Sequence, residues 1–479
     1  MKRTILFLTA LAGAAAAAQA AYRIEAAVAG AENVAVYLAR YEGMRPVDID
    51  SAKFNDKGVV VFAAPKATLP GGLYMLRFTA DENPQQLELV VSGEPKFEVS
   101  IAANMLNIEK SLKYSKSAEN EGFKKFLDGN QRIGRKVQQL QQRYQQHQDN
   151  PDSIRSIQEQ YAALMREQKA HSEAIVAEYR GTFLATLVRA VMEPDMPQFD
   201  VPENAANPDS IRQRQMLAFA QKHFFDNFDL ADARIVNAPM LDNRMIIFFQ
   251  QIMRQEPADT INAAIDALLA RAQKAQPVYR FMLTWLYDRY TESPIEGHYA
   301  VGLHLCGILS DSTTATWLTD REKTKLKQNI RKFRLNPVGA AATDLTLQTA
   351  EGEFKSLHSI SAPITLLYFF NPGCGSCLAT TPVLHEIYEK YREQGVEVFA
   401  VYPDKDSAAW VKYVNEKGYT DWVNVWDGEG TAGIYEKYSM HAIPQVYVLD
   451  ERKVVRYKDI YVNDLEEILQ VELKRLNNK

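Results

Sequence analysis

Residues 364–377 read ITLLYFFNPGCGSC and place two cysteines, Cys374 and Cys377, shortly after an apolar run. The run has the length and composition of a buried strand, and Leu378–Tyr391 continues with the spacing of a helix. A cysteine at the start of a helix lies next to free backbone N–H groups, which stabilise its thiolate. The second cysteine, one turn later, is close enough to attack a disulfide formed by the first. The spacing therefore predicts a reactive dithiol at a strand-to-helix junction.

The residues on either side of this junction alternate between strand and helix patterns. They predict a hairpin, then strand, helix, strand, helix, strand, a helical turn, two antiparallel strands and a final helix. The expected strands are 344–348, 353–357, 364–370, 396–402, 422–426, 445–449 and 454–458, and the expected helices are 374–393, 407–417, 432–438 and 464–476.

Residues 335–479 resemble exported thioredoxin-like proteins of the TlpA/ResA type. The motifs that carry the resemblance are Cys374-Gly375-Ser376-Cys377 and, further along the chain, Ile443-Pro444. The resemblance implies a thioredoxin fold and thiol:disulfide oxidoreductase activity. It implies that Cys374 is the nucleophile and that Cys377 resolves the mixed disulfide.

The resemblance also assigns the surface around the dithiol. It implies that Pro444 is a cis proline that lies against the active disulfide, which is an uncommon feature. Ile443 would expose its backbone for pairing with a substrate strand, and Gly375 and Ser376 would line the substrate-binding surface. The expected partners are disulfides or dithiols of exported proteins and an upstream membrane electron donor, and no cofactor is implied.

The sequence departs from the family at the groups that move the proton of the second thiol. The buried acid of thioredoxins corresponds to Tyr368, and the glutamate of ResA-type proteins corresponds to Thr380. Attack by Cys377 requires its deprotonation, so another group or water must accept the proton. His441 is the nearest titratable residue in the sequence, and we hypothesise this role for it; a surface-loop histidine is the alternative.

The pair Gly375-Ser376 lacks the histidine that strongly oxidising sites place between the cysteines. With less support for the Cys374 thiolate, the reduced form is less stabilised, which favours a reductase of exported proteins. Two other functions remain open: an interaction protein that uses the thioredoxin unit as a scaffold, and a thiol peroxidase. The peroxidase is disfavoured because Asn371 stands where peroxidases of this fold carry a threonine.

Residues 1–20 have the composition of a cleaved signal peptide. Lys2 and Arg3 precede an apolar, alanine-rich run, and Ala18-Gln19-Ala20 fits a cleavage site, so the mature chain is expected to begin at Ala21. The run has too few strongly apolar residues for a membrane anchor, and no cysteine follows it for lipid attachment. The protein is therefore expected to be exported to the periplasm and not to span the membrane once processed.

The formal charge is −5 at pH 7 and becomes −7 when Lys2 and Arg3 are removed. A mildly acidic chain does not favour nucleic acid as a partner.

Three cysteines are too few for a fold stabilised by disulfides, so we interpret the Cys-x-x-Cys as a reactive pair rather than as a structural disulfide. Cys306 lies in an apolar helical stretch and is interpreted as a buried packing thiol. The spacing of the eight histidines predicts no metal site.

The hydrophobic pattern of the mature chain changes twice, which predicts a multidomain protein. Residues 21–113 alternate in hydrophobicity between turn formers, as in an all-β sandwich-like domain. Residues 117–333 follow helical spacing and predict an all-α domain, with a long exposed hairpin over 130–170. Residues 335–479 are expected to form the α/β thioredoxin fold that the resemblance implies. The segment 220–333 resembles an uncharacterised helical domain found upstream of such folds, and the β region resembles another uncharacterised module.

The hexapeptide Asn-Pro-Asp-Ser-Ile-Arg occurs twice, at 150–155 and 207–212. Each copy predicts a helix start, with Asn as the N-cap, Pro at the first helical position and Asp in the first turn. Because the flanking sequences differ, we interpret the copies as two independent caps rather than as an internal repeat.

Overall fold

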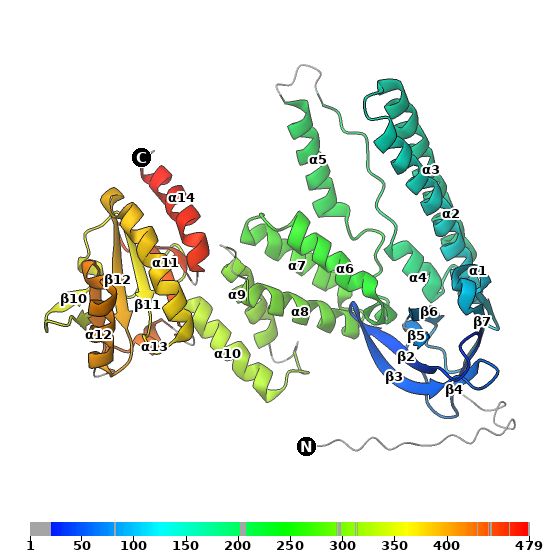
Figure 1. Cartoon of the computed structure of the whole chain (residues 1–479), viewed down its shortest axis with the longest axis horizontal. Coiled ribbons are helices and arrows are strands. Elements are labelled where there is room, and N and C mark those ends of the chain that lie inside the picture. The colour runs from blue at the N-terminus through cyan, green and yellow to red at the C-terminus, as the bar shows by residue number, and fades with distance from the viewer. Residues whose placement is uncertain are drawn as a thin grey trace. The chain divides into compact units, whose positions relative to one another are not determined.

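The computed structural model describes residues 21–477 apart from 81, 82, 202–206, 294, 296, 297, 312, 314, 429, 439, 441, 442 and 459. The chain forms two compact units (Figure 1). One consists of the chain up to Glu256 together with Ala267–Phe281, and the other of Pro257–Asp266 together with the chain from Met282 onward. Across the described residues, no helix combines the length and the apolar character needed to cross a membrane.

The N-terminal part is a sandwich of two four-stranded sheets, with strand orders β4-β1-β7-β8 and β3-β2-β5-β6. Alternate side chains of both sheets enter one core, for example Ile24 and Val99 from the first sheet and Leu38 and Leu89 from the second. The predicted all-β sandwich is therefore confirmed, and its two layers follow from the alternation of apolar residues. The strands are β1 (Tyr22–Ala29), β2 (Ala35–Glu42), β3 (Arg45–Lys53), β4 (Val59–Ala64), β5 (Gly72–Ala80), β6 (Asn83–Val91), β7 (Phe97–Asn104) and β8 (Lys113–Ser115).

Helix α2 (Ala118–Gln146) is fixed to the sandwich by the side chain of Asn120, which is fully buried. The Asn120 amide accepts a hydrogen bond from the backbone N–H of Val90 and donates one to the carbonyl of Val90, both at 2.8 Å. Val90 lies on β6, the edge strand of the second sheet. The side chain thus satisfies backbone groups that a sheet edge otherwise leaves unpaired.

The predicted exposed hairpin is formed by α2 and α3 (Pro151–Glu178), which lie side by side (Figure 1). Its own core is small, and the buried members are Ile133, Leu140, Ile157 and Leu164. Most other positions of the two helices are exposed and polar, which explains why this stretch of the sequence is rich in Gln, Arg and Glu.

Both copies of the hexapeptide begin a helix, as predicted. The Asn150 side chain accepts a hydrogen bond from the Ser153 N–H at 3.0 Å, at the start of α3. The Asn207 side chain accepts one from the Ser210 N–H at 3.1 Å, at the start of α5 (Pro208–His223).

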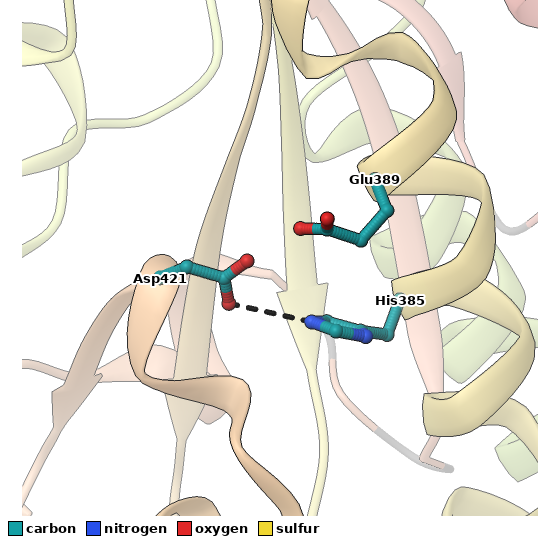
Figure 2. Close-up of side chains that lie close together, drawn as sticks. All are labelled: His385, Glu389 and Asp421. Carbon is teal, nitrogen blue, oxygen red and sulfur yellow. Dashed lines mark hydrogen bonds and ion pairs between the residues drawn. The ribbon is translucent and has the colours of Figure 1, made fainter.

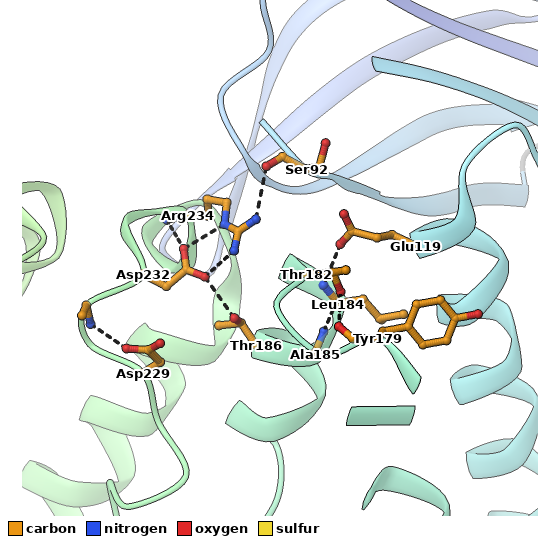
Figure 3. A network of polar contacts seen from close by, with 11 residues as sticks. Ser92, Glu119, Tyr179, Thr182, Leu184, Ala185, Thr186, Asp229, Asp232 and Arg234 are labelled. Atoms are coloured by element: carbon orange, nitrogen blue, oxygen red, sulfur yellow. Dashed lines mark hydrogen bonds and ion pairs between the residues drawn. The ribbon is translucent and has the colours of Figure 1, made fainter. Parts of the chain in front are cut away.

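A polar network joins the sandwich to the helices that follow it (Figure 3). The Arg234 guanidinium donates to the carboxylate of Asp232 at 2.7 Å and to the carbonyl of Ser92, just after β6, at 3.3 Å. The Asp232 carboxylate also accepts a hydrogen bond from the Thr186 hydroxyl at 3.0 Å.

The remaining helical elements are η2 (Met105–Asn107), α1 (Ile108–Ser111), α4 (Phe183–Ala190), η3 (Ala233–Asn237), α6 (Pro239–Ile247), η4 (Phe248–Ile252), α7 (Ala258–Ala272), α8 (Gln276–Thr291), α9 (His298–Ser310) and α10 (Asp320–Arg334).

The C-terminal part is built on a seven-stranded sheet of order β10-β9-β13-β12-β11-β14-β15. Strands β11, β12 and β13 are parallel, and β14 runs antiparallel to β11. Helices α11, α12 and α14 pack on one face of the sheet, and α13 packs on the other. The bounds are β9 (Thr346–Gln348), β10 (Phe354–Ser356), η5 (Leu357–Ser359), β11 (Ile364–Phe369), α11 (Gly375–Tyr391), η6 (Arg392–Gln394), β12 (Val396–Tyr402), α12 (Ser407–Lys417), η7 (Tyr419–Asp421), β13 (Val423–Trp426), α13 (Ile434–Lys437), β14 (Gln445–Asp450), β15 (Val455–Lys458), η8 (Val462–Asp464) and α14 (Leu465–Asn477).

This order confirms the predicted thioredoxin-type fold. Strand β11 is buried along its whole length, as its apolar sequence predicted. Phe369, at the end of β11, pairs with Gln445, at the start of β14. The loop after β11 and the residues before β14 therefore lie at the same edge of the sheet.

We expect Asn120→Ala to destabilise the folded chain, because it leaves the Val90 N–H and C=O buried without partners. Each such group costs about 1–3 kcal/mol. Chemical denaturation followed by circular dichroism measures the change. Gln138→Ala, at an exposed position of the same helix, is the matched control and should stay within about 0.5 kcal/mol of the parent. Equal effects of the two substitutions would contradict this role of Asn120.

Candidate active site

Cys374 is the N-cap residue of α11, and its Sγ accepts a hydrogen bond from the backbone N–H of Cys377 at 3.4 Å. Asn371 holds the preceding turn. Its side chain accepts from the Gly373 N–H at 2.7 Å, and its carbonyl accepts from the Cys374 N–H at 3.0 Å. The turn thus keeps the first sulfur at the positive end of the helix dipole.

The two thiols lie in different environments. Cys374 is half-buried, whereas the side chain of Cys377 is almost fully enclosed in the core below the helix. Burial raises the pKa of the Cys377 thiol to about 12. Partial burial also opposes ionisation of Cys374, but hydrogen bonds from the Cys377 thiol and from the backbone N–H groups of Cys377 and Ser376 outweigh it. They hold the pKa of Cys374 below its ordinary value of 9.0.

The Ile443–Pro444 peptide bond is cis. The carbonyl oxygen of Ile443 lies 3.5 Å from Sγ of Cys374 and accepts a hydrogen bond from the thiol. Gly375 and Ser376 are exposed, and a Cβ added to Gly375 would meet no atom within 4 Å. Cys374, Gly375, Ser376 and the Ile443 carbonyl therefore lie together at one edge of the sheet, with open space beside Gly375.

Two hydroxyl groups lie behind the buried thiol. The Thr381 hydroxyl donates to the backbone carbonyl of Cys377 at 2.7 Å, and the Tyr368 hydroxyl lies 2.8 Å from Thr381 Oγ1. Since the Thr381 proton is already donated, Tyr368 is the donor of the second bond. Burial raises the pKa of Tyr368, so the pair stays neutral. It occupies the place where the sequence lacks the family's buried acid.

The remaining candidate residues are distributed as follows. Cys306 is fully buried on α9, as expected of a packing thiol, and burial raises its pKa to about 12. Thr380 is half-buried on α11. His441 lies outside the residues that the structure describes, so its proton-transfer role stays a prediction.

Sequence reasoning missed two residues of the site. Thr381 lies four positions after Cys377 and so on the same face of the helix, a spacing that could have identified it. Asn371 belongs to the turn signal Asn-Pro-Gly, which indicates a loop but does not reveal that its side chain holds the turn before Cys374.

Comparison with known proteins agrees with this geometry. Residues 338–458 match the model of the AhpC/TSA family, and residues 141–336 match a domain of unknown function, DUF5106. The helical resemblance predicted for 220–333 is thereby confirmed and extends further toward the N-terminus.

Curated relatives match the C-terminal part. The thiol-disulfide oxidoreductase ResA of Bacillus thuringiensis is 27% identical over 140 residues, which cover 29% of this chain and 78% of that protein. The thiol:disulfide interchange protein DsbE of Pseudomonas aeruginosa is 29% identical over 99 residues, which cover 21% of this chain and 52% of that protein. A thioredoxin-like protein from Bacteroides caccae of known crystal structure is 26% identical, with a TM-score of 0.46, over 58% of this chain and 99% of that one. The predicted resemblance to thioredoxin-like oxidoreductases is confirmed.

We expect iodoacetamide to alkylate Cys374 of the reduced protein first, with a pH midpoint below 9.0, and to leave Cys377 unmodified until much higher pH. The reason is that only the thiolate reacts. Mass spectrometry of protein alkylated across a pH series measures both rates. Cys377→Ala removes the side-chain hydrogen-bond donor and should move the Cys374 midpoint upward without abolishing its reaction. Equal alkylation rates of the two native thiols would rule out the predicted asymmetry.

Proposed function

We propose that this chain, whose C-terminal part is a thioredoxin-like domain related to the ResA and DsbE oxidoreductases, reduces disulfides of exported proteins through Cys374 and Cys377. The observation that carries the proposal is the inequality of the two thiols. One is accessible and has a lowered pKa at a helix N-terminus, and the other is buried three positions later with a pKa of about 12.

In the first step, the Cys374 thiolate attacks one sulfur of a substrate disulfide. A bond forms between Cys374 and that sulfur, the substrate S–S bond breaks, and the second substrate sulfur leaves as a thiolate that takes up a proton. The lowered pKa of Cys374 increases the fraction of the thiol that is present as the reactive thiolate. The burial of Cys377 keeps it from competing for the substrate.

In the second step, Cys377 loses its proton and attacks Sγ of Cys374. The bond between Cys374 and the substrate sulfur breaks, and that sulfur leaves as a thiolate that takes up a proton to complete the substrate dithiol. The substrate has gained two electrons, which the two cysteines have lost in forming the Cys374–Cys377 disulfide. The hydroxyl groups of Tyr368 and Thr381 are neutral and already hydrogen-bonded. They therefore do not accept the proton of Cys377 and only provide a polar environment near it. The proton passes to water, or to His441 as the sequence suggested.

Substrate docking uses the edge where Ile443 and Pro444 face Cys374. We assign Ile443 to backbone pairing with an extended substrate segment and Pro444 to closing the site beneath it. The exposed Gly375 and Ser376 leave room for a folded client, because no side chain projects over the sulfur from Gly375.

We infer the direction of electron flow, from the dithiol to the substrate, from the groups that stabilise the Cys374 thiolate. Its pKa is lowered by a thiol and two backbone N–H groups, and no charged side chain of the described residues contributes. Without a charged group to stabilise the thiolate further, we expect the dithiol to act as a reductant. An exported reductase needs a supply of electrons, so we assign a membrane dithiol donor as the upstream partner and the periplasm, reached through the signal peptide 1–20, as the compartment.

We expect Cys374→Ser to abolish reduction of a model protein disulfide and Cys377→Ser to stall as a mixed disulfide with the substrate. The first variant lacks the nucleophile and the second lacks the resolving thiol. Turbidity of reduced insulin and non-reducing gels measure the two outcomes. Cys306→Ser is the matched control and should retain full activity. Activity that survives Cys374→Ser would exclude the proposal, and turnover that depends on peroxide instead of a disulfide would favour a thiol peroxidase.

We expect the Cys374–Cys377 pair to have a reduction potential near or below about −230 mV, in the range of thioredoxin-type reductants. Thiol trapping in glutathione and dithiothreitol buffers measures it. A potential near about −120 mV would reverse the direction and make the protein an oxidant of folding clients. A pair that fails to exchange in any buffer would favour the interaction-protein alternative.

A further inference from the structure

Three potential metal ligands meet on the helix that carries the dithiol (Figure 2). His385 and Glu389 lie four positions apart on α11, and this spacing places them on one face of the helix. Asp421 ends η7, the turn that leads into β13, and lies 36 positions after His385 in the sequence. Figure 2 shows the imidazole and both carboxylates directed toward a common point.

The ligand atoms are close enough for one ion to bridge them. His385 Nε2 lies 3.4 Å from Asp421 Oδ1, and one ligand atom of each residue lies within 4.8 Å of the others. Zinc bonds of about 2.0–2.2 Å in a tetrahedral arrangement hold ligands about 3.3–3.6 Å apart. His385 and Asp421 already meet this distance, and the exposed Glu389 side chain can reach it by changing rotamer.

The imidazole and the turn are held in place before any ion binds. The His385 ring packs against Tyr419 and Trp422, with centroid separations of 4.9 and 5.4 Å. The Tyr388 hydroxyl donates to the backbone carbonyl of Asp421 at 3.2 Å, which ties the turn to α11. A ring and a turn that are fixed by packing lose little freedom on binding a ligand.

Arg392 is the cation that faces the same carboxylates. Its Nη1 lies 2.9 Å from Glu389 Oε1 and 3.6 Å from Asp421 Oδ2. The Asp421 oxygen that faces His385 is Oδ1, so the guanidinium and the imidazole use different oxygens of that carboxylate. Arg392 can therefore orient both carboxylates from outside while one oxygen of each remains for an ion, as outer hydrogen-bond partners do at metal sites.

We propose that His385, Glu389 and Asp421 form a Zn²⁺ site, with water completing the coordination. One imidazole nitrogen and two carboxylates match the mixed N/O ligands of zinc better than the all-oxygen sites of calcium and magnesium. The ion joins α11 to the turn before β13 and so braces the helix whose N-cap is Cys374. The site stands apart from the dithiol and does not depend on the redox function.

Isothermal titration with ZnCl₂ tests the site in the mature chain with both Cys374→Ser and Cys377→Ser, since the dithiol would otherwise bind zinc itself. We expect one ion per chain, at least tenfold weaker binding after His385→Ala or Glu389→Gln, and a zinc-dependent rise in the unfolding temperature that the same substitutions remove. His304→Ala is the matched control, because His304 pairs with Asp266 at 2.8 Å but belongs to no group of three ligands among the described residues.

Glu389→Gln keeps the test informative if His385→Ala disturbs the aromatic packing, since Glu389 is exposed. Absence of saturable binding in the chain that carries Cys374→Ser and Cys377→Ser would overturn the proposal and leave the cluster as an ion-pair network around Arg392. Binding that survives both substitutions would place the ion elsewhere and overturn it equally.

Discussion

The arrangement of the dithiol depends on the start of helix α11, where the sulfur of Cys374 accepts a hydrogen bond from the backbone N–H of Cys377. A serine, threonine or asparagine usually accepts such a bond at a helix start, and here a thiol does so. The same helical turn directs the two sulfurs differently, one toward solvent and one into the core. The first turn of α11 therefore gives both the accessible thiol and the buried thiol of the proposed reaction, and the buried strand β11 leads into the loop before it.

Local patterns in the sequence predicted most of the fold. The alternation of apolar residues predicted the sandwich, the helical spacing predicted the hairpin of α2 and α3, and the order of strands and helices predicted the C-terminal sheet. These succeeded because each reflects a periodicity within one element. The cysteine pair was predicted from its position at a strand-to-helix junction, whereas Ile443-Pro444 was assigned to the site through the resemblance to thioredoxin-like proteins.

Contacts between distant segments were not predictable in this way. The Tyr368–Thr381 pair and the meeting of Asp421 with His385 depend on how a strand, a helix and a turn pack together. The anchoring of α2 by Asn120 is similar, because nothing near Asn120 in the sequence shows that a sheet edge lies beside it. Histidine spacing alone gave no indication of a metal site, because two of the three proposed ligands are carboxylates.

The position of β1 has a consequence for the order in which the protein assembles. It is the first strand of the described chain, yet it lies inside its sheet, antiparallel to β4 and parallel to β7. Because β7 ends at Asn104, β1 has a neighbour on both sides only after the chain has been made as far as that residue. A nascent segment that stops before β7 carries an unpaired strand edge, which is a target for chaperones. The sandwich is thus expected to fold as one event, late rather than strand by strand.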